Sequence, residues 1–181
     1  LLLEFANELP ELPERLRDHP DLMERVIECQ SPVYLFSEVD EEGRVHVHAT
    51  ARQQRGGVQQ QLQAHQIGRG HFVVASVPFV DTTLAMGDIV ECVTIGGAFH
   101  VDTVVVRGGA STVRVLPEDP EGQDPNEIAG TLLAFGCHVE LGPGGMLAAG
   151  IGADCPREGI TEWLGGLEAQ GAIQLAPGYM A

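Results

Sequence analysis

The sequence predicts an α+β protein, and three features of its pattern support this class. Near the N-terminus, apolar residues recur every three or four positions, which is the spacing of a helix with one buried face. Between His71 and Leu116, short β-branched runs alternate with glycine-containing turns, as in antiparallel strands. Beyond that region, helix-type and strand-type segments alternate. Hydrophobic residues make up 44% of the 181 residues, which is enough to form a core.

The N-terminal segment is predicted to be helical, with interruptions. Pro10 and Pro13 limit the first helix, because proline inside a helix removes a backbone hydrogen bond, so short helical pieces are expected to follow. Pro20 suits the first turn of a second helix. That helix is expected to end near Cys29, because the Ser-Pro pair that follows it favours an extended backbone.

Two strands joined by a turn are predicted next, over Val33–Val39 and Arg44–Thr50. In the second strand His46 and His48 face one side and the valines beside them face the other, because side chains alternate along a strand. The glutamine-rich stretch Ala51–Ala64 has little apolar content. We therefore predict a weak helix or a linker there, and we place a boundary between two parts of the chain within it.

Beyond this stretch the sequence becomes rich in strands. Gly96-Gly97 and Gly108-Gly109 are hairpin signals, because glycine accepts the positive φ angles of tight turns. The β-branched runs around them are predicted to form a mainly antiparallel sheet. These runs are His71–Val77, Ile89–Ile95, Ala98–Arg107 and Ser111–Leu116.

The last part of the chain alternates between helices and strands. Asp124-Pro125 is expected to begin a helix and Gly136 to end it, as a capping aspartate, an early proline and a closing glycine do. Together with the strand that starts at Ser111, the order β-α-β-β-α-β predicts a ferredoxin-like split βαβ unit. The elements after that strand are a helix at Asn126–Phe135, strands at Cys137–Leu141 and Met146–Ile151, a helix at Glu158–Gln170 and a strand at Ala172–Leu175.

The charge composition excludes several kinds of enzyme and partner. The chain has 26 acidic residues against 10 basic ones, for a formal net charge of −16, and all 10 basic residues are arginines. Without lysine the chain cannot build a P-loop, a kinase site or a Schiff base with pyridoxal phosphate, and we predict no cofactor. The acidity argues against binding to nucleic acid or to an anionic membrane, and it favours a basic protein partner.

The four cysteines lie at wide spacings, at Cys29, Cys92, Cys137 and Cys155. No Cys-x-x-Cys pair is present, which argues against a zinc ribbon or a thioredoxin-like site. We therefore predict free thiols and a cytoplasmic protein. No apolar run approaches the roughly 18 residues of a membrane span, and the first residues lack the pattern of a secretion signal.

A series of motifs near the N-terminus carries a family resemblance. The motifs are Leu3–Ala6, Leu9–Leu16, Met23–Phe36, Asp40–His46 and Arg55–Gly57. Together, over about residues 1–64, they closely resemble the first half of the SufE family. The resemblance implies that this segment has a SufE-like helix–loop–β-hairpin fold.

The resemblance also implies a function for Cys29. Members of the SufE family accept sulfur as a cysteine persulfide from a cysteine desulfurase, which is a pyridoxal phosphate enzyme, and pass it on for iron–sulfur cluster assembly. By resemblance, Cys29 is the persulfide acceptor and the desulfurase is the partner. The protein is then an accessory protein for sulfur transfer, a carrier rather than a self-sufficient enzyme.

The remainder of the chain carries a second resemblance, in Val77–Phe79, Leu84–Val90, Arg107–Val115 and Leu133–Cys137. Residues 65–181 resemble a small bacterial domain family of unknown function. This implies a compact α+β domain without known chemistry. The chain is thus predicted to consist of a partial SufE-like segment, residues 1–64, and an α+β domain, residues 65–181.

His46 and His48 form a second, weaker candidate site. Two imidazoles at alternate positions share one face of a strand, a spacing that many metal sites use. Cys29 or His65 would supply a third ligand for zinc or iron. The alternative interpretation is a solvated strand face that holds no metal.

The charge also supports a function without sulfur transfer. A non-enzymatic acidic binding protein, such as an inhibitor or immunity-type protein, would use its negative surface to capture a basic protein. Cys29 would then have no role, and the affinity would fall steeply with salt.

Overall fold

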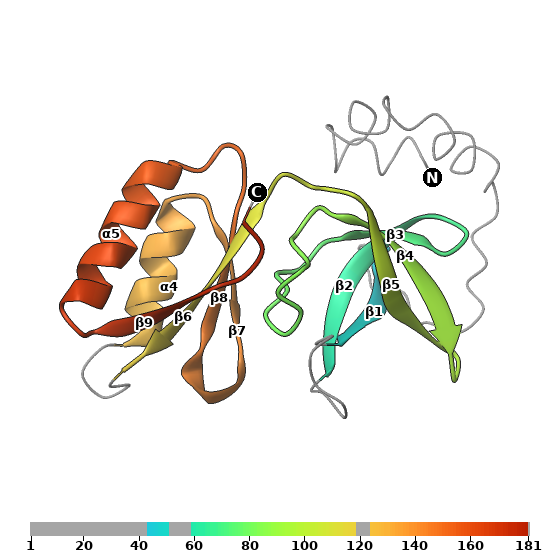
Figure 1. The fold of residues 1–181 in the computed structure, drawn as a ribbon, viewed down its shortest axis with the longest axis horizontal. Coiled ribbons are helices and arrows are strands. Elements are labelled where there is room, and N and C mark those ends of the chain that lie inside the picture. The colour runs from blue at the N-terminus through green and yellow to red at the C-terminus, as the bar shows by residue number, and fades with distance from the viewer. Residues whose placement is uncertain (1–42, 51–58, 119–123, 181) are drawn as a thin grey trace.

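The computed structural model describes residues 43–50, 59–118 and 124–180, which form two units side by side (Figure 1). One unit is a closed five-stranded barrel, and the other is a four-stranded sheet with two helices. This combination confirms the predicted α+β class. The predicted N-terminal helices and the strand Val33–Val39 lie outside the described residues.

Five strands follow one another around the barrel in sequence order. Neighbouring strands are antiparallel, except that the first and last strands are parallel and close the barrel through the pairs Val47–Phe99 and His48–His100. Because each strand has two neighbours, the barrel has no free sheet edge. The strands are β1 (Val45–Thr50), β2 (Gln59–Gly68), β3 (His71–Val74), β4 (Ile89–Ile95) and β5 (Ala98–Val106).

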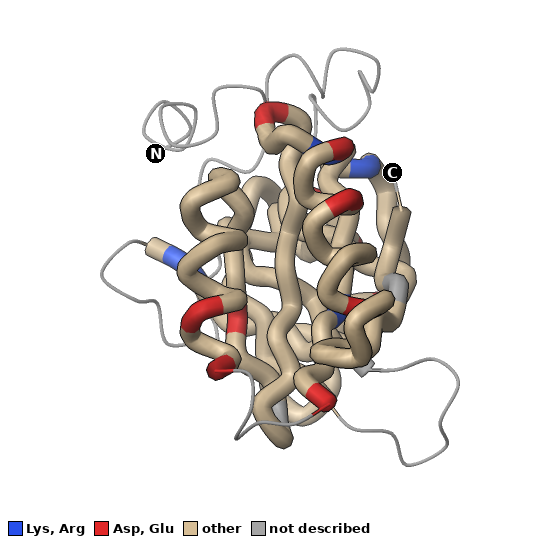
Figure 2. Tube along the Cα trace, turned by 90° about the vertical axis from the view of Figure 1, so that its left-hand side faces the viewer, with Lys and Arg blue, Asp and Glu red and all other residues tan. Residues whose placement is uncertain are grey.

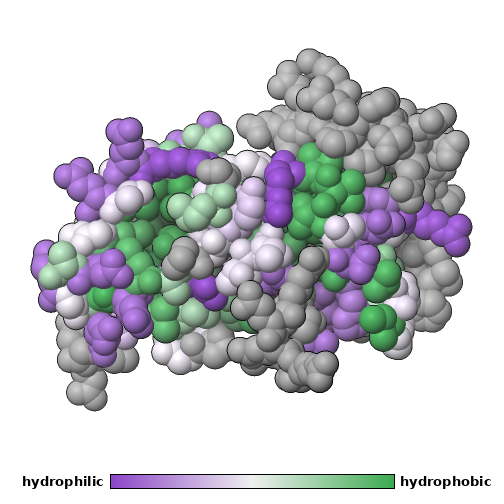
Figure 3. Space-filling view, viewed as in Figure 1, coloured by the Kyte–Doolittle hydropathy of each residue, from purple (hydrophilic) through white to green (hydrophobic). Residues whose placement is uncertain are grey.

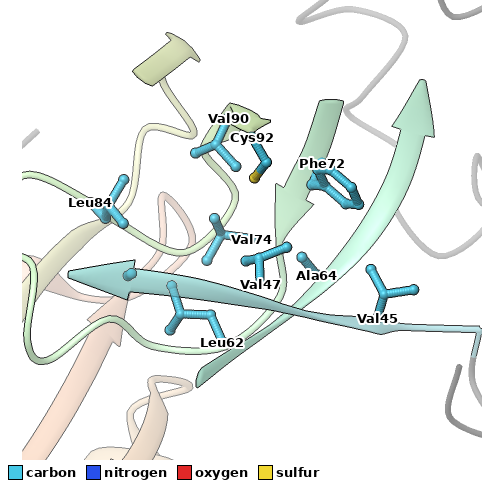
Figure 4. Close-up of a cluster of buried hydrophobic side chains, with 10 residues drawn as sticks. Val45, Val47, Leu62, Ala64, Phe72, Val74, Leu84, Val90 and Cys92 are labelled. Carbon is cyan, nitrogen blue, oxygen red and sulfur yellow. The ribbon is translucent and has the colours of Figure 1, made fainter. Parts of the chain in front are cut away.

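Apolar side chains from alternate strand positions fill the barrel (Figure 4). Phe72 and Leu62 are fully buried there, and the ring of Phe99 packs 4.7 Å from that of Phe72 between centroids. Full burial of one such side chain stabilises the folded state by about 1.5–3 kcal/mol. The other buried members of this cluster are Val45, Val47, Ala49, Ala64, Val74, Leu84, Val90 and Cys92.

Strand β2 differs from the expectation for its sequence. A weak helix or linker was predicted through Ala64, and from Gln59 onwards this is wrong, because the residues form a strand. Leu62 and Ala64 point into the barrel while Gln59 and Gln61 are exposed, so the alternation of a strand is present beneath the glutamines. Strand β2 also runs through residue 64, where the two parts of the chain were predicted to divide. The division into residues 1–64 and 65–181 stays a prediction.

The second unit is an antiparallel sheet with the strand order β7-β8-β6-β9. Both helices lie on one face of the sheet (Figure 1) and bury Ile128, Leu132, Ile160 and Leu164 against it. The elements are β6 (Ser111–Pro117), α4 (Pro125–Ala134), β7 (His138–Leu141), the short helix η1 (Pro143–Gly145), β8 (Leu147–Ile151), α5 (Arg157–Ala169) and β9 (Ile173–Pro177).

Local signals place the ends of α4 where the sequence predicts them. The Asp124 side chain accepts a hydrogen bond from the Asn126 N–H at 2.9 Å, which satisfies one of the unpaired donors at the start of the helix. Gly136 follows the helix with a φ of 84°, a left-handed conformation that glycine adopts without strain. Cys137 then turns inward and His138 outward, as their strand positions predict.

The long connection between β3 and β4 lies between the two units (Figure 1). Its Val77 N–H donates to the Glu140 carboxylate of β7 at 2.9 Å. Gln60 of β2 holds the same connection from the barrel side, since its side-chain oxygen accepts from the N–H groups of Phe79 and Val80. The connection is therefore bonded to both units.

Candidate functional site

The predicted persulfide acceptor, Cys29, lies outside the described residues. Its role therefore stays a prediction from the sequence. The other three cysteines, the candidate histidines and the polar groups between the two units all lie within the described residues.

Three histidines lie close together on the outer side of the barrel, where β1 meets β5. His46 and His48 come from β1 and His100 from β5. The parallel register places His48 beside His100, and their rings stack with centroids 5.0 Å apart and an interplanar angle of 23°. Burial lowers the pKa of His48, and the nearby His100 and His46 lower it further. Sequence reasoning paired His46 with His48, but the register adds His100.

The described residues do not surround His46 and His48 with a metal-binding set. No group of three or more His, Cys, Asp or Glu side chains that could hold a metal ion occurs within residues 43–50, 59–118 and 124–180. His65, proposed as a third ligand, lies on β2 with only 7% of its surface exposed. The cluster therefore offers closely spaced imidazoles, of which His48 has a lowered pKa.

The most elaborate polar arrangement surrounds Asp88, at the start of β4, which has no exposed surface. One carboxylate oxygen accepts from the Ala85 N–H at 3.0 Å and from the Arg107 guanidinium at 2.9 Å. The other accepts from the Gly108 N–H at 2.7 Å. Arg107 also donates to the Thr83 carbonyl at 2.7 Å. These bonds fix the chain where β5 leaves the barrel and leads into β6.

The Arg107 guanidinium also lies over the ring of Tyr179, 4.0 Å from its centroid, so it contacts the C-terminal segment as well. Gly108 packs closely against the backbone of Gly87, where a Cβ atom would lie 2.5 Å from the carbonyl carbon. The hairpin predicted at Gly108-Gly109 is wrong, because β5 belongs to the barrel and β6 to the other sheet. No local pattern indicates that this turn meets the one at Gly87-Asp88. Since Gly108 leads into β6, and Tyr179 accepts a hydrogen bond from the Thr112 N–H of β6, the contacts around Asp88 link the two units.

The described cysteines differ in exposure and ionisation. Burial, with smaller effects from Glu91 and Asp102 nearby, raises the pKa of the Cys92 thiol to about 12. Burial likewise raises the pKa of Cys137 to about 12, with added effects from the neighbouring Cys155 and from a hydrogen bond with its side chain. Cys155 is partly exposed. At neutral pH, Cys92 and Cys137 therefore contain very little of the reactive thiolate.

Acidic residues occur at several positions along the helical face of the second unit (Figure 2). Glu158, Glu162 and Glu168 of α5 and Glu127 of α4 are all exposed, and Arg157 is the single basic residue within α5. On the side of the molecule drawn in Figure 3, apolar residues are visible on both units among polar ones. The four glutamates give the helical face exposed negative charge.

No helix in the described part of the chain is long and apolar enough to cross a membrane.

Two family models match different parts of the chain. Residues 1–56 match the SufE family, described as an Fe-S metabolism associated domain, which confirms the resemblance of the N-terminal motifs. Residues 60–175 match a domain of unknown function, DUF4265. The SufE match includes both Cys29 and strand β1.

The curated relatives match a short part of the chain. Uncharacterised SufE-like proteins from two strains of Mycobacterium tuberculosis are each 51% identical over 51 residues, which is 28% of this chain. The alignment covers 34% of each relative, so the chain spans about a third of the length of the curated relatives it matches.

A solved structure resembles the larger part of the fold. A hypothetical protein from Neisseria gonorrhoeae matches with a TM-score of 0.63 and 12% identity, over 75% of this chain and 94% of its own. At this identity the likeness concerns the fold alone. Because the DUF4265 match extends over more than half of the sequence, the chain belongs to the DUF4265 family.

Proposed function

We propose that this protein is a sulfur-transfer accessory protein of iron–sulfur cluster assembly, in which Cys29 accepts a persulfide from a cysteine desulfurase. The observation that carries this proposal is the match of residues 1–56 to the Fe-S metabolism associated domain, since Cys29 lies inside it. The 51% identity to SufE-like proteins over 51 residues supports it.

The proposed step is a thiol–persulfide exchange. The Cys29 thiolate attacks the outer sulfur of a persulfide on the desulfurase, and the bond between the two sulfurs breaks. The desulfurase cysteine leaves as a thiolate, while Cys29 becomes the persulfide. No external electron donor is needed. The chain has no lysine to hold pyridoxal phosphate itself, so the sulfur must come from a separate enzyme.

The burial and pKa of the described cysteines favour transfer of sulfur to Cys29 rather than to Cys92 or Cys137. A pKa of about 12 leaves Cys92 and Cys137 almost entirely protonated, and both are buried. A protonated, buried thiol reacts poorly with a persulfide held on a separate protein, which cannot reach it. Cys155 is the one partly exposed cysteine in the described part of the chain, and it is therefore the matched control for Cys29.

The proposal includes a fold for the N-terminal segment and for the second unit. We infer a SufE-like helix–loop–hairpin for the N-terminal segment and a ferredoxin-like split βαβ unit for β6 to β9 with α4 and α5. The element order β-α-β-β-α-β and the all-antiparallel order β7-β8-β6-β9 support the second inference. The exposed acidic face of α4 and α5 would meet a basic surface on the desulfurase.

Mass spectrometry tests the sulfur-transfer proposal. The full chain is incubated with a cysteine desulfurase and cysteine, and we expect a gain of about 32 Da, one sulfur atom, on Cys29. The Cys29→Ala variant should lose this adduct, and Cys155→Ala should keep it. No adduct, or an adduct spread over the other cysteines, would contradict the proposal.

The acidic face supports one alternative function, a non-enzymatic inhibitor or immunity-type protein that captures a basic protein. The exposed Glu127, Glu158, Glu162 and Glu168 would form its contact surface. Affinity capture from the parent lysate at low and high salt separates the two functions. A desulfurase among the captured proteins favours sulfur transfer, whereas a different basic protein that is released by salt favours the alternative.

A further inference from the structure

Two cysteines from separate elements meet in the second unit. Cys137 follows the glycine that ends α4 and leads into β7, and Cys155 comes directly before Pro156 at the start of α5. The Cys155 thiol donates a hydrogen bond to the Gly136 carbonyl at 3.4 Å, on the residue next to Cys137. Both cysteines also pack in the same apolar cluster, and Cys155 is one of the groups that raise the pKa of Cys137.

The two thiols have unequal access to solvent. Cys155 is partly exposed, whereas Cys137 exposes 4% of its surface and belongs to the apolar cluster beneath the helices. A reagent in solution therefore meets Cys155 first. Cys137 is shielded from reagents, and the Cys155 sulfur lies 3.4 Å from the carbonyl oxygen of Gly136, the residue before Cys137. Thiol–disulfide exchange proceeds through a mixed disulfide, so the accessible thiol reacts first and the neighbouring thiol then completes the bond.

We propose that Cys137 and Cys155 form a reversible disulfide, in which Cys155 reacts first with a small-molecule disulfide and Cys137 completes the bond. The Cys155 thiolate attacks one sulfur of the small disulfide, and one small thiolate leaves. Cys137 releases its proton to solvent and attacks the Cys155 sulfur, which displaces the second small thiol. The two cysteines lose two electrons and two protons, and the small disulfide is reduced to two thiols.

An aromatic pair beside these cysteines reports on the reaction. Phe135, two residues before Cys137, packs against Trp163 of α5 with ring centroids 5.9 Å apart. Trp163 is the single tryptophan of the chain. A disulfide between the end of α4 and the start of α5 would alter the surroundings of this ring. Its fluorescence should therefore change in step with oxidation and return to its starting value on reduction.

The experiment uses the reduced full chain with oxidised glutathione. We expect the loss of two hydrogen atoms in mass, a peptide that links Cys137 to Cys155, and reversal by a reducing dithiol. Cys137→Ala should stop at a glutathione adduct on Cys155, because the second thiol is missing. Cys155→Ser should give neither the adduct nor the link. Cys92→Ala, which removes the other buried cysteine of the described residues, should oxidise like the natural chain.

Two further measurements keep the outcomes distinct. Thermal unfolding of each reduced variant shows whether it folds. If Cys137→Ala does not fold, the result for Cys155→Ser tests the inference. The Cys29→Ala variant should still form the link, so this inference stands apart from the sulfur-transfer proposal. A folded chain in which Cys137 and Cys155 stay reduced, or in which either cysteine links to Cys29 or Cys92 instead, would overturn the inference.

Discussion

Asp88 combines a carboxylate of zero exposure with three N–H donors, one of which belongs to a charged guanidinium. Removing a charge from water costs several kcal/mol, and only good geometry with fully bonded lone pairs offsets this cost. Arg107 supplies the opposite charge, and the N–H groups of Ala85 and Gly108 bond to the carboxylate from the backbone. Since all three donors are aimed at one anion, a neutral replacement leaves them poorly matched.

We predict that Asp88→Asn lowers the free energy of unfolding by about 3 kcal/mol, because the arginine charge loses its partner and the amide NH2 group faces other donors. Urea unfolding followed by circular dichroism measures the change. Glu162→Gln makes the same chemical change on an exposed helix position and should stay within about 0.5 kcal/mol of the natural chain. Equal stability of the two variants would show that Asp88 is not a structural link.

The stacked histidines give a second prediction at this scale. Because burial lowers the pKa of folded His48, the unfolded chain binds a proton more readily than the folded one. The contribution of His48 to stability is therefore present above its ordinary pKa of 6.5 and is lost as the pH falls through the lowered value. His48→Gln should flatten the fall in stability below neutral pH.

Chemical unfolding of the natural chain and His48→Gln at a series of pH values between about 7 and 5 measures this difference. Thr94→Gln is the control, since Thr94 is an exposed side chain on β4 that does not titrate, and its curve should follow that of the natural chain. A His48→Gln curve that also follows the natural one would show that the stack at the β1–β5 contact does not affect stability.

At the scale of elements, a helix or strand could be predicted from the sequence when the residues that determine it lie within or beside it. Helix α4 begins one residue before its predicted start, and β4 spans the predicted residues, because capping residues, glycines and β-branched runs lie within those segments. Strand β2 was missed because Leu62 and Ala64 are its only inward apolar residues within the glutamine-rich stretch. The parallel pairing of β1 with β5 joins residues far apart in sequence, and no local pattern specifies it.

The meeting of two turns at Gly108 gives a prediction for these elements. A Cβ atom at Gly108 would lie 2.5 Å from the Gly87 carbonyl carbon and 2.8 Å from the Asp88 nitrogen. Because backbone atoms cannot move aside easily, we expect Gly108→Ala to lower the free energy of unfolding by about 2 kcal/mol or more. Gly130→Ala on α4 is the matched control, since a Cβ atom added at Gly130 would meet nothing within 4 Å.

The control, Gly130→Ala, should raise the free energy of unfolding rather than lower it. Alanine is favoured over glycine inside a helix by roughly 0.5–1 kcal/mol, so Gly130→Ala should raise the unfolding midpoint. Thermal unfolding of both variants compares the two effects directly. A Gly108→Ala variant as stable as the natural chain would mean that the two turns separate without cost.

At the scale of the whole molecule, the contact between barrel and sheet contains a half-buried carboxylate. Burial raises the pKa of Glu140 above 4.5, although its hydrogen bond from Val77 and the nearby His138 act to lower it. The folded state therefore binds a proton more readily than the unfolded chain. The contribution of Glu140 to stability is fully present below pH 4.5 and is lost as the pH rises through the raised value.

Glu140→Gln should remove this loss, because the amide oxygen still accepts from the Val77 N–H but carries no charge at any pH. We predict that the variant is more stable than the natural chain at neutral pH, and that the difference shrinks towards about pH 4. Urea unfolding at both pH values measures it, with the exposed Glu168→Gln as the control. A variant less stable at neutral pH would show that the charge itself strengthens the contact.

Some candidate site residues could be predicted from a continuous stretch of sequence, whereas others come together only through the packing of distant elements. Cys29 could be proposed from the sequence, because its motif is continuous along the chain. The contact between Cys137 and Cys155 could not, since it depends on how α4, β7 and α5 pack together. The third histidine was also missed, because only the register of β1 against β5 brings His100 beside His48.

Strand β1 has a consequence for how the two family regions are joined. It lies within the part that matches SufE, residues 1–56, yet it pairs with β2 and β5, which lie in the part that matches DUF4265, residues 60–175. The region that matches SufE thus supplies one strand of the barrel, whose other strands lie in the region that matches DUF4265. A fragment starting after residue 56 would leave β2 and β5 with unpaired edges, prone to self-association.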